Sequence, residues 1–368
     1  MAVRRTSGQG SMSVGVDVGG TKILAALVNP EGQILATCKR RTRAERGVEE
    51  VIERVVRSVH DVVDEVGLMF HEIRAVGVGV PGPVDTSRGF VSVAPNLGWK
   101  DLPIGDLLSQ AMDGTRVVVG NDANCCILGE HRFGAARGFS HVVGMFIGTG
   151  VGGGLILNGQ LYTGAGQLAG EVGHMTIRMD GPRTAAGFRG TVESLGGRLA
   201  IVSDIELAIA SGKKSIISEL EDAEGERRVR SKMLARAFEL GDKVVVRAVK
   251  RSSVAIGLGA SALVHALAPE CLLLGGGVVE ALGQGYVDRI ERTCRAHIFP
   301  AQAANLVVRM SSLGDHAGVL GAASLAMEAL AAGPASKASP PAPAHVAAPA
   351  NGPLPASSSR RVAGPPAG

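Results

Sequence analysis

The stretch "VGVDVGGTKILAALVNPEG", residues 14–32, has a second copy in "VGMFIGTGVGGGLILNG", residues 143–159. Residues 14–29 align with residues 143–158 without a gap, and each copy reads as apolar strand, glycine-rich turn, apolar strand and tight turn. The second copy ends in Asn158-Gly159, which is typical of a type I′ hairpin turn. Two similar hairpins predict a duplicated α/β domain, with a cleft in which both glycine turns face one ligand.

The sequence around the first copy supports alternating strands and helices. The strand-like run "QILAT" follows the hairpin, and a helix is predicted from about residue 46 to residue 66. Apolar residues recur on one face of that helix: Val48, Val51, Ile52, Val55, Val59, Val62 and Val66. This alternation is typical of α/β layers.

Composition excludes several functional classes. The chain has 368 residues, 45% of them hydrophobic and 20% charged, as expected for a globular protein of two domains. A net charge of +4, with one basic block at residues 39–46, gives little reason to expect nucleic acid binding. No apolar run reaches about 18 residues, so we expect neither secretion nor membrane insertion. The five scattered cysteines predict reduced thiols in the cytoplasm: Cys38, Cys125, Cys126, Cys271 and Cys294.

The glycine-rich turns are candidate phosphate sites of an unusual kind. "GTGVGG", residues 148–153, and "GAGQLA", residues 164–169, fit dinucleotide-binding patterns, but no helix directly follows the glycines of the first. A Rossmann site needs that helix, so the match is interpreted as accidental. Successive N–H groups in a glycine turn can still hold an anion, because no Cβ blocks its approach.

Side chains with chemistry follow predicted strands. "DVGGTK" carries Asp17, Thr21 and Lys22, and a carboxylate beside phosphates usually acts through a divalent cation. A structural turn with surface charges is the alternative. Asn121 and Asp122 follow the run "RVVV", where α/β folds place ligands, although this pair could instead cap the next helix.

Together these motifs resemble the ROK sugar kinases, whose bacterial glucokinases belong to the actin-like ATPase superfamily. Seven pieces occur in the family's order: "DVGGTK", "GVPGPVD", "APNLGW", "NDANCCILGE", "GTGVGGG", "GAGQLAGEVGH" and "PECLLLGGGV". The resemblance implies two duplicated actin-like (ribonuclease H-like) α/β domains with a cleft between them. The small domain would span residues 13–121 with a returning helix at about 316–331, and the large domain residues 122–315. Residues 1–12 and the Ala/Pro-rich tail, residues 333–368, are expected to be disordered.

The resemblance also implies site residues and cofactors. ATP with Mg²⁺ would lie in the cleft, with Asp17 a candidate contact for the metal. The first phosphate turn would use Asp17, Gly19, Gly20, Thr21 and Lys22; the second Gly148, Thr149, Gly150, Val151 and Gly152; and adenosine would pack at Gly275, Gly276 and Gly277. Asp122 matches the catalytic base. Sugar contacts match Gly82, Asn96, Asn121, Glu171, His174 and Glu193.

Glucose is the default acceptor, with an N-acetylhexosamine, mannose or fructose as rivals. Dimerisation is usual in the family. Many members are repressors with a helix-turn-helix domain ahead of the first strand, which we do not expect here because about a dozen residues precede that strand. A catalytically dead sugar-binding module is the other alternative. His265 is expected to be a packed core residue rather than a ligand.

One loop departs from the family pattern. Most members carry CxCGxxGCxE after "GH", and these cysteines bind a structural zinc with the histidine. In "TAAGFRGTVE" the three positions hold Thr184, Ala186 and Thr191, while Gly187, Gly190 and Glu193 are kept. Alanine and threonine do not replace a zinc-binding thiolate. We therefore expect no zinc, although His174 remains, and packing of Phe188 and Ile177 in its place.

Overall fold

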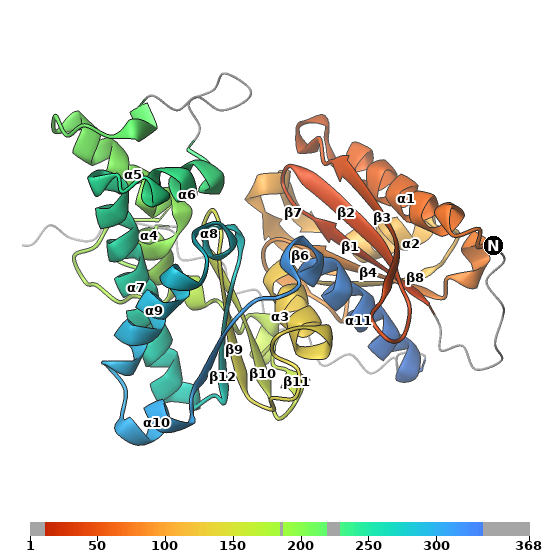
Figure 1. Ribbon diagram of the computed structural model, residues 1–368. Helices are drawn as coiled ribbons and strands as arrows, with labels where there is room; N and C mark the ends of the chain where they lie inside the picture. Colours follow the sequence, from red (N-terminus) through yellow and green to blue (C-terminus); the bar gives the residue numbers. More distant parts are fainter. Residues whose placement is uncertain (1–11, 185–186, 219–228, 334–368) are drawn as a thin grey trace, which may run out of the picture. The chain divides into compact units, whose positions relative to one another are not determined.

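Each copy of the repeat forms a hairpin inside its own five-stranded sheet in the computed structural model (Figure 1). The model describes residues 12–184, 187–218 and 229–333. The first sheet has the order β3-β2-β1-β4-β8 and the second β11-β10-β9-β12-β13. In each, the hairpin strands pair antiparallel and the next two strands pair parallel. The shared order confirms a duplicated α/β fold.

The strands of the two sheets have the following bounds. The first contains β1 (Ser13–Val18), β2 (Lys22–Val28), β3 (Ile34–Arg41), β4 (Ala75–Val80) and β8 (Arg116–Asn121). The second contains β9 (Val142–Ile147), β10 (Val151–Leu157), β11 (Gln160–Leu161), β12 (Cys271–Gly275) and β13 (Val307–Met310). Asn158 and Gly159 both have positive φ, 53° and 74°, so the predicted type I′ turn is confirmed.

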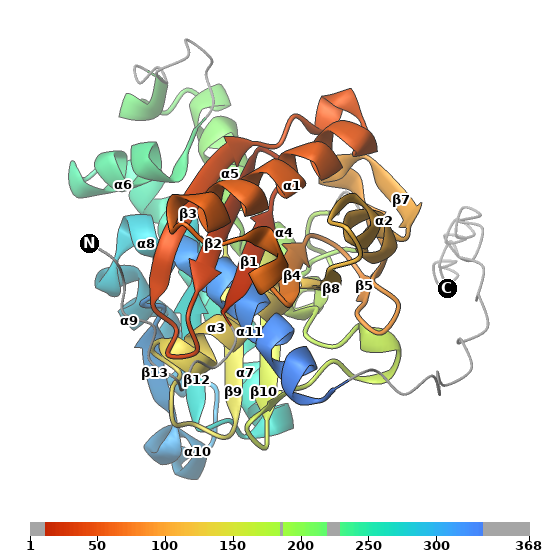
Figure 2. The same ribbon diagram turned by 90° about the vertical axis from the view of Figure 1, so that its right-hand side faces the viewer.

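Helices cover both faces of the first sheet. We call this sheet and the helices that cover it the N-terminal lobe. Ile23, Ala25 and Leu27 of β2 pack in the core with α1 (Val48–Glu65), whereas Leu24, Ala26 and Val28 contact α11 (Ala317–Ala331). The alternation of side chains along a strand therefore places the two helices on opposite faces (Figure 2). A small sheet, β5 (Val84–Asp85), β6 (Phe90–Ala94) and β7 (Trp99–Leu102), and α2 (Ile104–Ala111) complete this lobe.

The second sheet and the helices that follow it form the C-terminal lobe. These helices are α4 (Val192–Gly196), α5 (Arg198–Ala210), α6 (Ser231–Glu239), α7 (Lys243–Leu267), α8 (Gly277–Leu282), α9 (Gln284–Arg295) and α10 (Pro300–Asn305). Its core includes Met145 and Ile147 of β9 and Tyr286 of α9, all at most 1% exposed. Within the described residues no helix combines the length and apolar character that crossing a bilayer requires.

Two helices connect the lobes. The helix α3 (Asp122–Phe133) packs against α11 and β10, and α11 packs across β1 and β4. Glycines permit these approaches: a Cβ on Gly77 would lie 1.7 Å from the Ala322 carbonyl oxygen, and one on Gly321 would lie 1.7 Å from that of Cys125. The interface is thus backbone against backbone and leaves no room for a side chain.

A buried carboxylate fixes the segment that returns from β13 to α11. Glu130 of α3 is fully buried, and its Oε1 accepts hydrogen bonds from Ser311 Oγ at 2.5 Å, Ser312 N at 2.9 Å and Leu313 N at 2.8 Å. Its Oε2 accepts from Ala135 N at 2.8 Å. Ser312 Oγ also donates to Oε2, at 3.3 Å, so five donors satisfy a carboxylate whose burial alone would be unfavourable. Glu130 therefore holds the returning chain against α3.

The expectation for His265 is wrong, and two others lie outside the described residues. His265 is exposed on α7, where its Nε2 lies 2.9 Å from the His297 carbonyl oxygen and its ring packs edge-on against Phe299. His265 lies in the last turn of α7, which explains why its position in an apolar stretch of sequence did not make it a buried residue. Disorder of residues 1–11 and 334–368 concerns parts of the chain beyond the described ranges.

Candidate active site

The first glycine turn, residues 17–22, is a tight connection between β1 and β2. Gly19 N donates to the Lys22 carbonyl oxygen at 2.8 Å, and Thr42 Oγ1 donates to the Gly19 carbonyl oxygen at 2.6 Å. A Cβ on Gly20 would lie 3.1 Å from the Asn96 carbonyl oxygen, so a predicted sugar contact approaches this turn. The Lys22 ammonium pairs with Asp315 at 2.8 Å. Gly19 and Gly20 carry no Cβ, so their side chains do not block the approach of an anion to this turn.

The second turn, residues 148–152, joins β9 to β10 and has different supports. Gly148 N donates to the Gly150 carbonyl oxygen at 2.9 Å. Glu193 Oε2 accepts from Val151 N at 3.0 Å, and a Cβ on Gly150 would lie only 2.0 Å from that oxygen. Arg198 Nη2 donates to Thr149 Oγ1 at 2.9 Å. Because strand β10 follows the glycines, the interpretation of the dinucleotide match as accidental is confirmed.

Asn121 and Asp122 lie where β8 ends and α3 begins. Asn121 is the N-cap: its Oδ1 accepts from Asn124 N at 3.0 Å, and its Nδ2 donates to the Gly82 carbonyl oxygen at 3.1 Å. The capping interpretation is therefore correct for Asn121. Asp122 Oδ1 accepts from Ala123 N at 2.8 Å, which leaves Oδ2 for another partner.

Three carboxylates lie near one another around Asp122. Burial raises the pKa of Asp122 from 3.8 to about 6, with further contributions from the charges of Asp17 and Glu171. Burial likewise raises the pKa of Asp17 to about 6, while Lys22 opposes the shift. The structure thus brings Asp17 of the first turn, Asp122 and Glu171 into one electrostatic group. Perturbed carboxylates of this kind are candidates for acid–base or metal chemistry.

The N-terminal lobe contributes two loops to the acceptor side. Gly82 has a φ of 91°, and a Cβ there would lie 2.1 Å from the Val93 carbonyl oxygen, so only glycine fits. Asn96 is exposed in the 3₁₀ helix η3 (Pro95–Leu97). A hollow of about 1010 Å³ is lined by Asn96, Thr149, Gly150 and Glu193 among the predicted site residues. It therefore links one acceptor loop to the second turn.

The C-terminal lobe contributes the loop that carries Glu171 and His174. His174, in η5 (Val172–His174), has its Nε2 3.7 Å from Glu171 Oε2. His174 Nδ1 is buried and lacks a hydrogen-bond partner among the described residues. Glu193 differs from these two, because its carboxylate already supports the second turn. Its predicted sugar contact would have to share the carboxylate with Val151 N.

The glycines expected at the adenosine are placed beside the second turn. β12 ends at Gly275, and α8 begins at Gly277. Gly276 has a φ of 88°, and a Cβ there would lie 2.7 Å from the Ile147 carbonyl oxygen, one residue before the turn. A Cβ on Gly275 would meet Ser311 at 2.8 Å. Packing already requires glycine at these two positions, whatever ligand lies beside them.

The residues present do not fit a zinc site in the loop after His174. Thr191 is buried and caps α4, with its Oγ1 accepting from Ser194 N at 3.1 Å. The Thr184 N–H donates to the Phe188 carbonyl oxygen at 2.7 Å. Ala186 lies outside the described residues. No group of three His, Cys, Asp or Glu side chains suited to a metal occurs among the residues that can be described.

Apolar support for this loop is partial. Phe188 contacts the His174 ring at a centroid distance of 5.5 Å, yet its side chain is 54% exposed. Ile177 is partly buried and packs against the core of the C-terminal lobe. Hydrogen bonds do the rest: Ile177 N donates to the Gly190 carbonyl oxygen at 2.9 Å, and Val192 N donates to that of Met175 at 2.9 Å. Backbone pairing therefore supports the loop together with the partial packing of Phe188 and Ile177.

Sequence reasoning missed the residues that support the site. Glu130, Arg198 and the cap of Thr191 have no motif of their own, because each acts on a partner far away or on a helix too short to be predicted.

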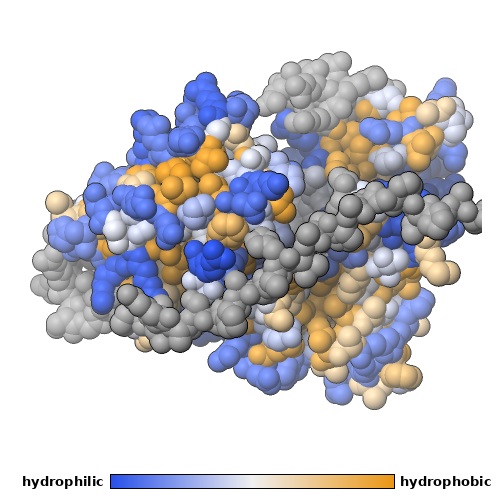
Figure 3. Space-filling model, turned by 180° about the vertical axis from the view of Figure 1, so that it is seen from behind, coloured by the Kyte–Doolittle hydropathy of each residue, from blue (hydrophilic) through white to orange (hydrophobic). Residues whose placement is uncertain are grey.

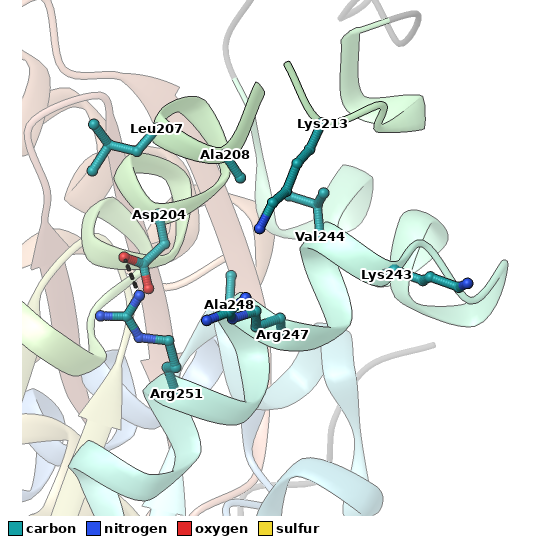
Figure 4. Close-up of a pocket in the computed structure, with 9 residues that line it drawn as sticks. All are labelled: Asp204, Leu207, Ala208, Lys213, Lys243, Val244, Arg247, Ala248 and Arg251. Atoms are coloured by element: carbon teal, nitrogen blue, oxygen red, sulfur yellow. Dashed lines mark ion pairs between the residues drawn. The ribbon is translucent and has the colours of Figure 1, made fainter. Parts of the chain in front are cut away.

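A second hollow, of about 410 Å³, lies between α5 and α7 and was not predicted from any motif (Figure 4). Its lining includes Lys213, Lys243, Arg247, Arg251 and Asp204, and none of the predicted site residues. We therefore place the candidate site at the turns and Asp122.

Comparison with known proteins identifies the family of the chain. The model of the ROK family matches residues 13–329. The glucokinase of Thermotoga maritima is 33% identical over 316 residues, which are 86% of this chain and 97% of that protein. A crystal structure of a ROK family glucokinase from Streptomyces griseus, in complex with glucose and AMPPNP, aligns with a TM-score of 0.75 at 32% identity. It covers 86% of this chain and all of the other.

Repressors match as well, at lower identity. The xylose repressor of Caldicellulosiruptor bescii is 27% identical over 312 residues, which are 84% of this chain and 76% of the repressor. The family match covers both sheets and every predicted site residue. The chain therefore belongs to the ROK family.

Proposed function

We propose that this protein is an ATP-dependent hexose kinase, with glucose as its acceptor and glucose 6-phosphate as its product. Glucokinases among its relatives support this assignment. The observation that carries it is the position of Asp122, a carboxylate with a raised pKa that is coupled both to Asp17 of the first turn and to Glu171 of the acceptor loop. A base between a phosphate site and a hydroxyl site is what phosphoryl transfer to a sugar requires.

The two glycine turns would hold the triphosphate of ATP, and Gly275, Gly276 and Gly277 would pack the adenosine. The glycines of both turns fit a triphosphate, because the lack of a Cβ leaves the backbone open to an anion, and Asp17 offers a carboxylate beside the first turn. Asp17 would hold Mg²⁺, which supplies neutralisation of phosphate charge when bound. Lys22 and Thr21 of the first turn and Thr149 of the second would orient the anion. A neighbouring cation favours the ionised form of Asp17 and so offsets the unfavourable effect of burial on that form.

Asp122 would act as the general base. Ala123 N occupies Oδ1 and fixes the carboxylate, so Oδ2 accepts the proton of the attacking hydroxyl. A pKa of about 6 leaves the group ionised near neutral pH and brings its basicity closer to the working pH.

The sugar would be held between the lobes. Asn96, Asn121 and the backbone at Gly82 would contact it from the N-terminal lobe, and Glu171, His174 and Glu193 from the C-terminal lobe. Carboxylates only accept hydrogen bonds, which suits hydroxyls that must donate one. Positions on both lobes make binding depend on how the two acceptor loops are held relative to each other.

A panel of sugars tests the acceptor. Glucose, mannose, fructose, N-acetylglucosamine and N-acetylmannosamine are compared by kcat/KM with MgATP, and ADP release is measured in parallel. We expect the highest kcat/KM for glucose. A higher kcat/KM for an N-acetylhexosamine, mannose or fructose would change the acceptor that we assign, but the protein would still be a kinase.

A non-catalytic sugar-binding regulator is the second candidate, because xylose repressors are among the relatives. Binding of sugar without any ADP release, across the whole panel, would favour it. Nucleic acid binding, which the modest net charge disfavours, would then be measured directly.

We further propose that the loop after His174 works without zinc. Its Thr191 hydroxyl is used as a helix cap, and threonine is not a zinc ligand of structural sites. The measurement is the metal content of protein purified without added metal. Stoichiometric zinc would contradict this proposal.

We also propose a homodimer in the cytoplasm that forms through α5 and α7. Helix α5 buries Ile201 and Ile205 but leaves Leu199 and Leu207 61% and 67% exposed, and Val254 of α7 is 46% exposed nearby. Figure 3 shows exposed apolar side chains on the back of the molecule. Charged residues such as Arg247, Arg251 and Asp204 border these apolar residues, which resembles the polar rim of an interface. The five free thiols agree with a reducing compartment.

Light scattering during gel filtration tests the dimer. Leu207→Asp should yield monomers. Leu240→Asp changes a leucine that is 57% exposed, against 67% for Leu207, and that does not line the hollow beside α5 and α7, so it should leave the dimer intact. A monomeric wild type would contradict the proposal.

A further inference from the structure

A strained residue lies on the loop that carries Glu171 and His174. Gln167, in η4 (Ala165–Gln167), has a φ of 59°, a left-handed conformation that is uncommon for a residue with a Cβ. Its neighbours Ala165, Gly166 and Leu168 are exposed, whereas the Gln167 side chain is partly buried. Such strain persists only where surrounding contacts compensate for it.

The compensating contacts cross from one lobe to the other. Gln167 Oε1 accepts from Thr86 N at 2.8 Å, and Gln167 Nε2 donates to Asp85 Oδ1 at 3.2 Å. Both ends of the amide are used, and only this orientation of the amide pairs a donor with an acceptor at each end. The partners are 81 and 82 residues away in the sequence.

Local hydrogen bonds hold Asp85 in place independently of the Gln167 amide. Asp85 Oδ1 also accepts from Ser87 N at 3.1 Å and from Ser87 Oγ at 2.6 Å. Asp85 thus closes a local turn next to Gly82, whose carbonyl oxygen holds Asn121 beside Asp122. A series of hydrogen bonds therefore leads from the Glu171 loop, through residues 82–86, to Asn121, the residue before the proposed base.

We propose that Gln167 is a positioning residue that determines acceptor affinity: its amide clasps residues 85 and 86 of the N-terminal lobe to the loop of Glu171 and His174. This rests on the proposed sugar kinase function. Gln167 lies four residues before Glu171, so a loop released at this point would let the C-terminal sugar contacts move away from Asp122. The phosphate turns share no hydrogen bond with Gln167, so nucleotide binding should not depend on it.

Three substitutions separate the clasp from the strain. Gln167→Ala removes the amide and keeps a Cβ at positive φ. Gln167→Gly removes the amide and relieves the strain. Gln167→Asn keeps an amide, and asparagine tolerates this backbone conformation. Its side chain is one methylene shorter, so the amide cannot reach both partners. Ser87→Ala is the matched control, because it removes a hydrogen bond to the same Asp85 oxygen without touching the link between lobes.

The test compares KM for glucose, KM for ATP and kcat, together with calorimetric glucose binding in the absence of nucleotide. We expect all three Gln167 variants to raise KM and Kd for glucose about tenfold, as the loss of two hydrogen bonds suggests, with KM for ATP within about twofold. Ser87→Ala should stay near wild type. Thermal melting verifies folding, and Gln167→Gly should melt no lower than Gln167→Ala.

Three outcomes would overturn the inference. One is unchanged glucose affinity in Gln167→Ala and Gln167→Gly. Another is an equal rise of both KM values, which indicates a general structural role. The third is an effect in Gln167→Ala that Gln167→Gly lacks, which assigns it to strain. A wild type that binds glucose without phosphorylating it would refute the kinase but not the clasp, since the binding measurement still applies.

Discussion

The two glycine turns are copies of one hairpin, yet they are supported in opposite ways. The first turn brings its own charges, Asp17 and Lys22, and Asp315 pairs with the lysine. The second has no charged residue, and Glu193 and Arg198 support it from α4 and α5. The two copies thus share the backbone of the proposed phosphate turns, whereas the side chains that support each turn differ. The predictions below test this division.

The largest effect is expected at Asp122, which the first turn influences through Asp17. Asp122→Asn should lower kcat at least about 100-fold, the lower range for general-base catalysis, while sugar binding persists. It should also raise the free energy of unfolding at pH 8 by about 1–2 kcal/mol, because ionisation of the buried carboxyl disfavours the fold once the pH exceeds its ordinary pKa. Steady-state kinetics and thermal melting measure both. A near-normal kcat would refute the role of base.

The support of the second turn can be broken at one atom. Gly150→Ala places a Cβ 2.0 Å from Glu193 Oε2, and overpacking of this size commonly costs about 1–3 kcal/mol. We expect KM for ATP to rise about 5- to 100-fold. Gly148→Ala is the matched change in the same turn, with no atom within 4 Å of the new Cβ, and should have a smaller effect. Equal effects would show that the turn does not depend on Glu193.

The pH profile follows from the raised pKa of Asp122. The base must be ionised, so kcat/KM for glucose at saturating MgATP should fall as the pH drops through about 6. An ordinary aspartate would titrate near 3.9, two pH units lower. Between pH 6 and pH 5 we expect kcat/KM to fall about five- to sixfold, because the ionised fraction of a group with a pKa of about 6 falls by that factor, with folding checked at both values. An acid limb below pH 5 would contradict the environment described for Asp122.

The smallest effect is expected at the cap that orients Glu193. Thr191→Ala removes the acceptor for Ser194 N and should destabilise the protein by about 1 kcal/mol, whereas Thr191→Ser should retain the cap. Denaturant unfolding measures both, and a small rise in KM for ATP should accompany the alanine variant only. No difference between the variants would show that α4 needs no cap to hold Glu193 at the second turn.

The duplicated hairpins, the α/β class and the positions of the glycine turns could be predicted from the sequence. These depend on local properties: alternation along strands, glycine in turns, and the Asn158-Gly159 dipeptide. The sequence also indicated Asp122, because a polar residue after a parallel strand lies at the edge where ligands bind.

Which side chains contact one another could not be predicted from the sequence. The bonds of Glu130 with residues 311–313, of Glu193 with Val151 and of Gln167 with Thr86 join partners 42 to 183 residues apart. Such pairs leave no periodic pattern in the sequence, because their geometry depends on how complete elements pack. For the same reason the sequence placed His265 in the core, whereas the end of α7 leaves it exposed. Local signals fix the elements, and packing between distant segments fixes the site.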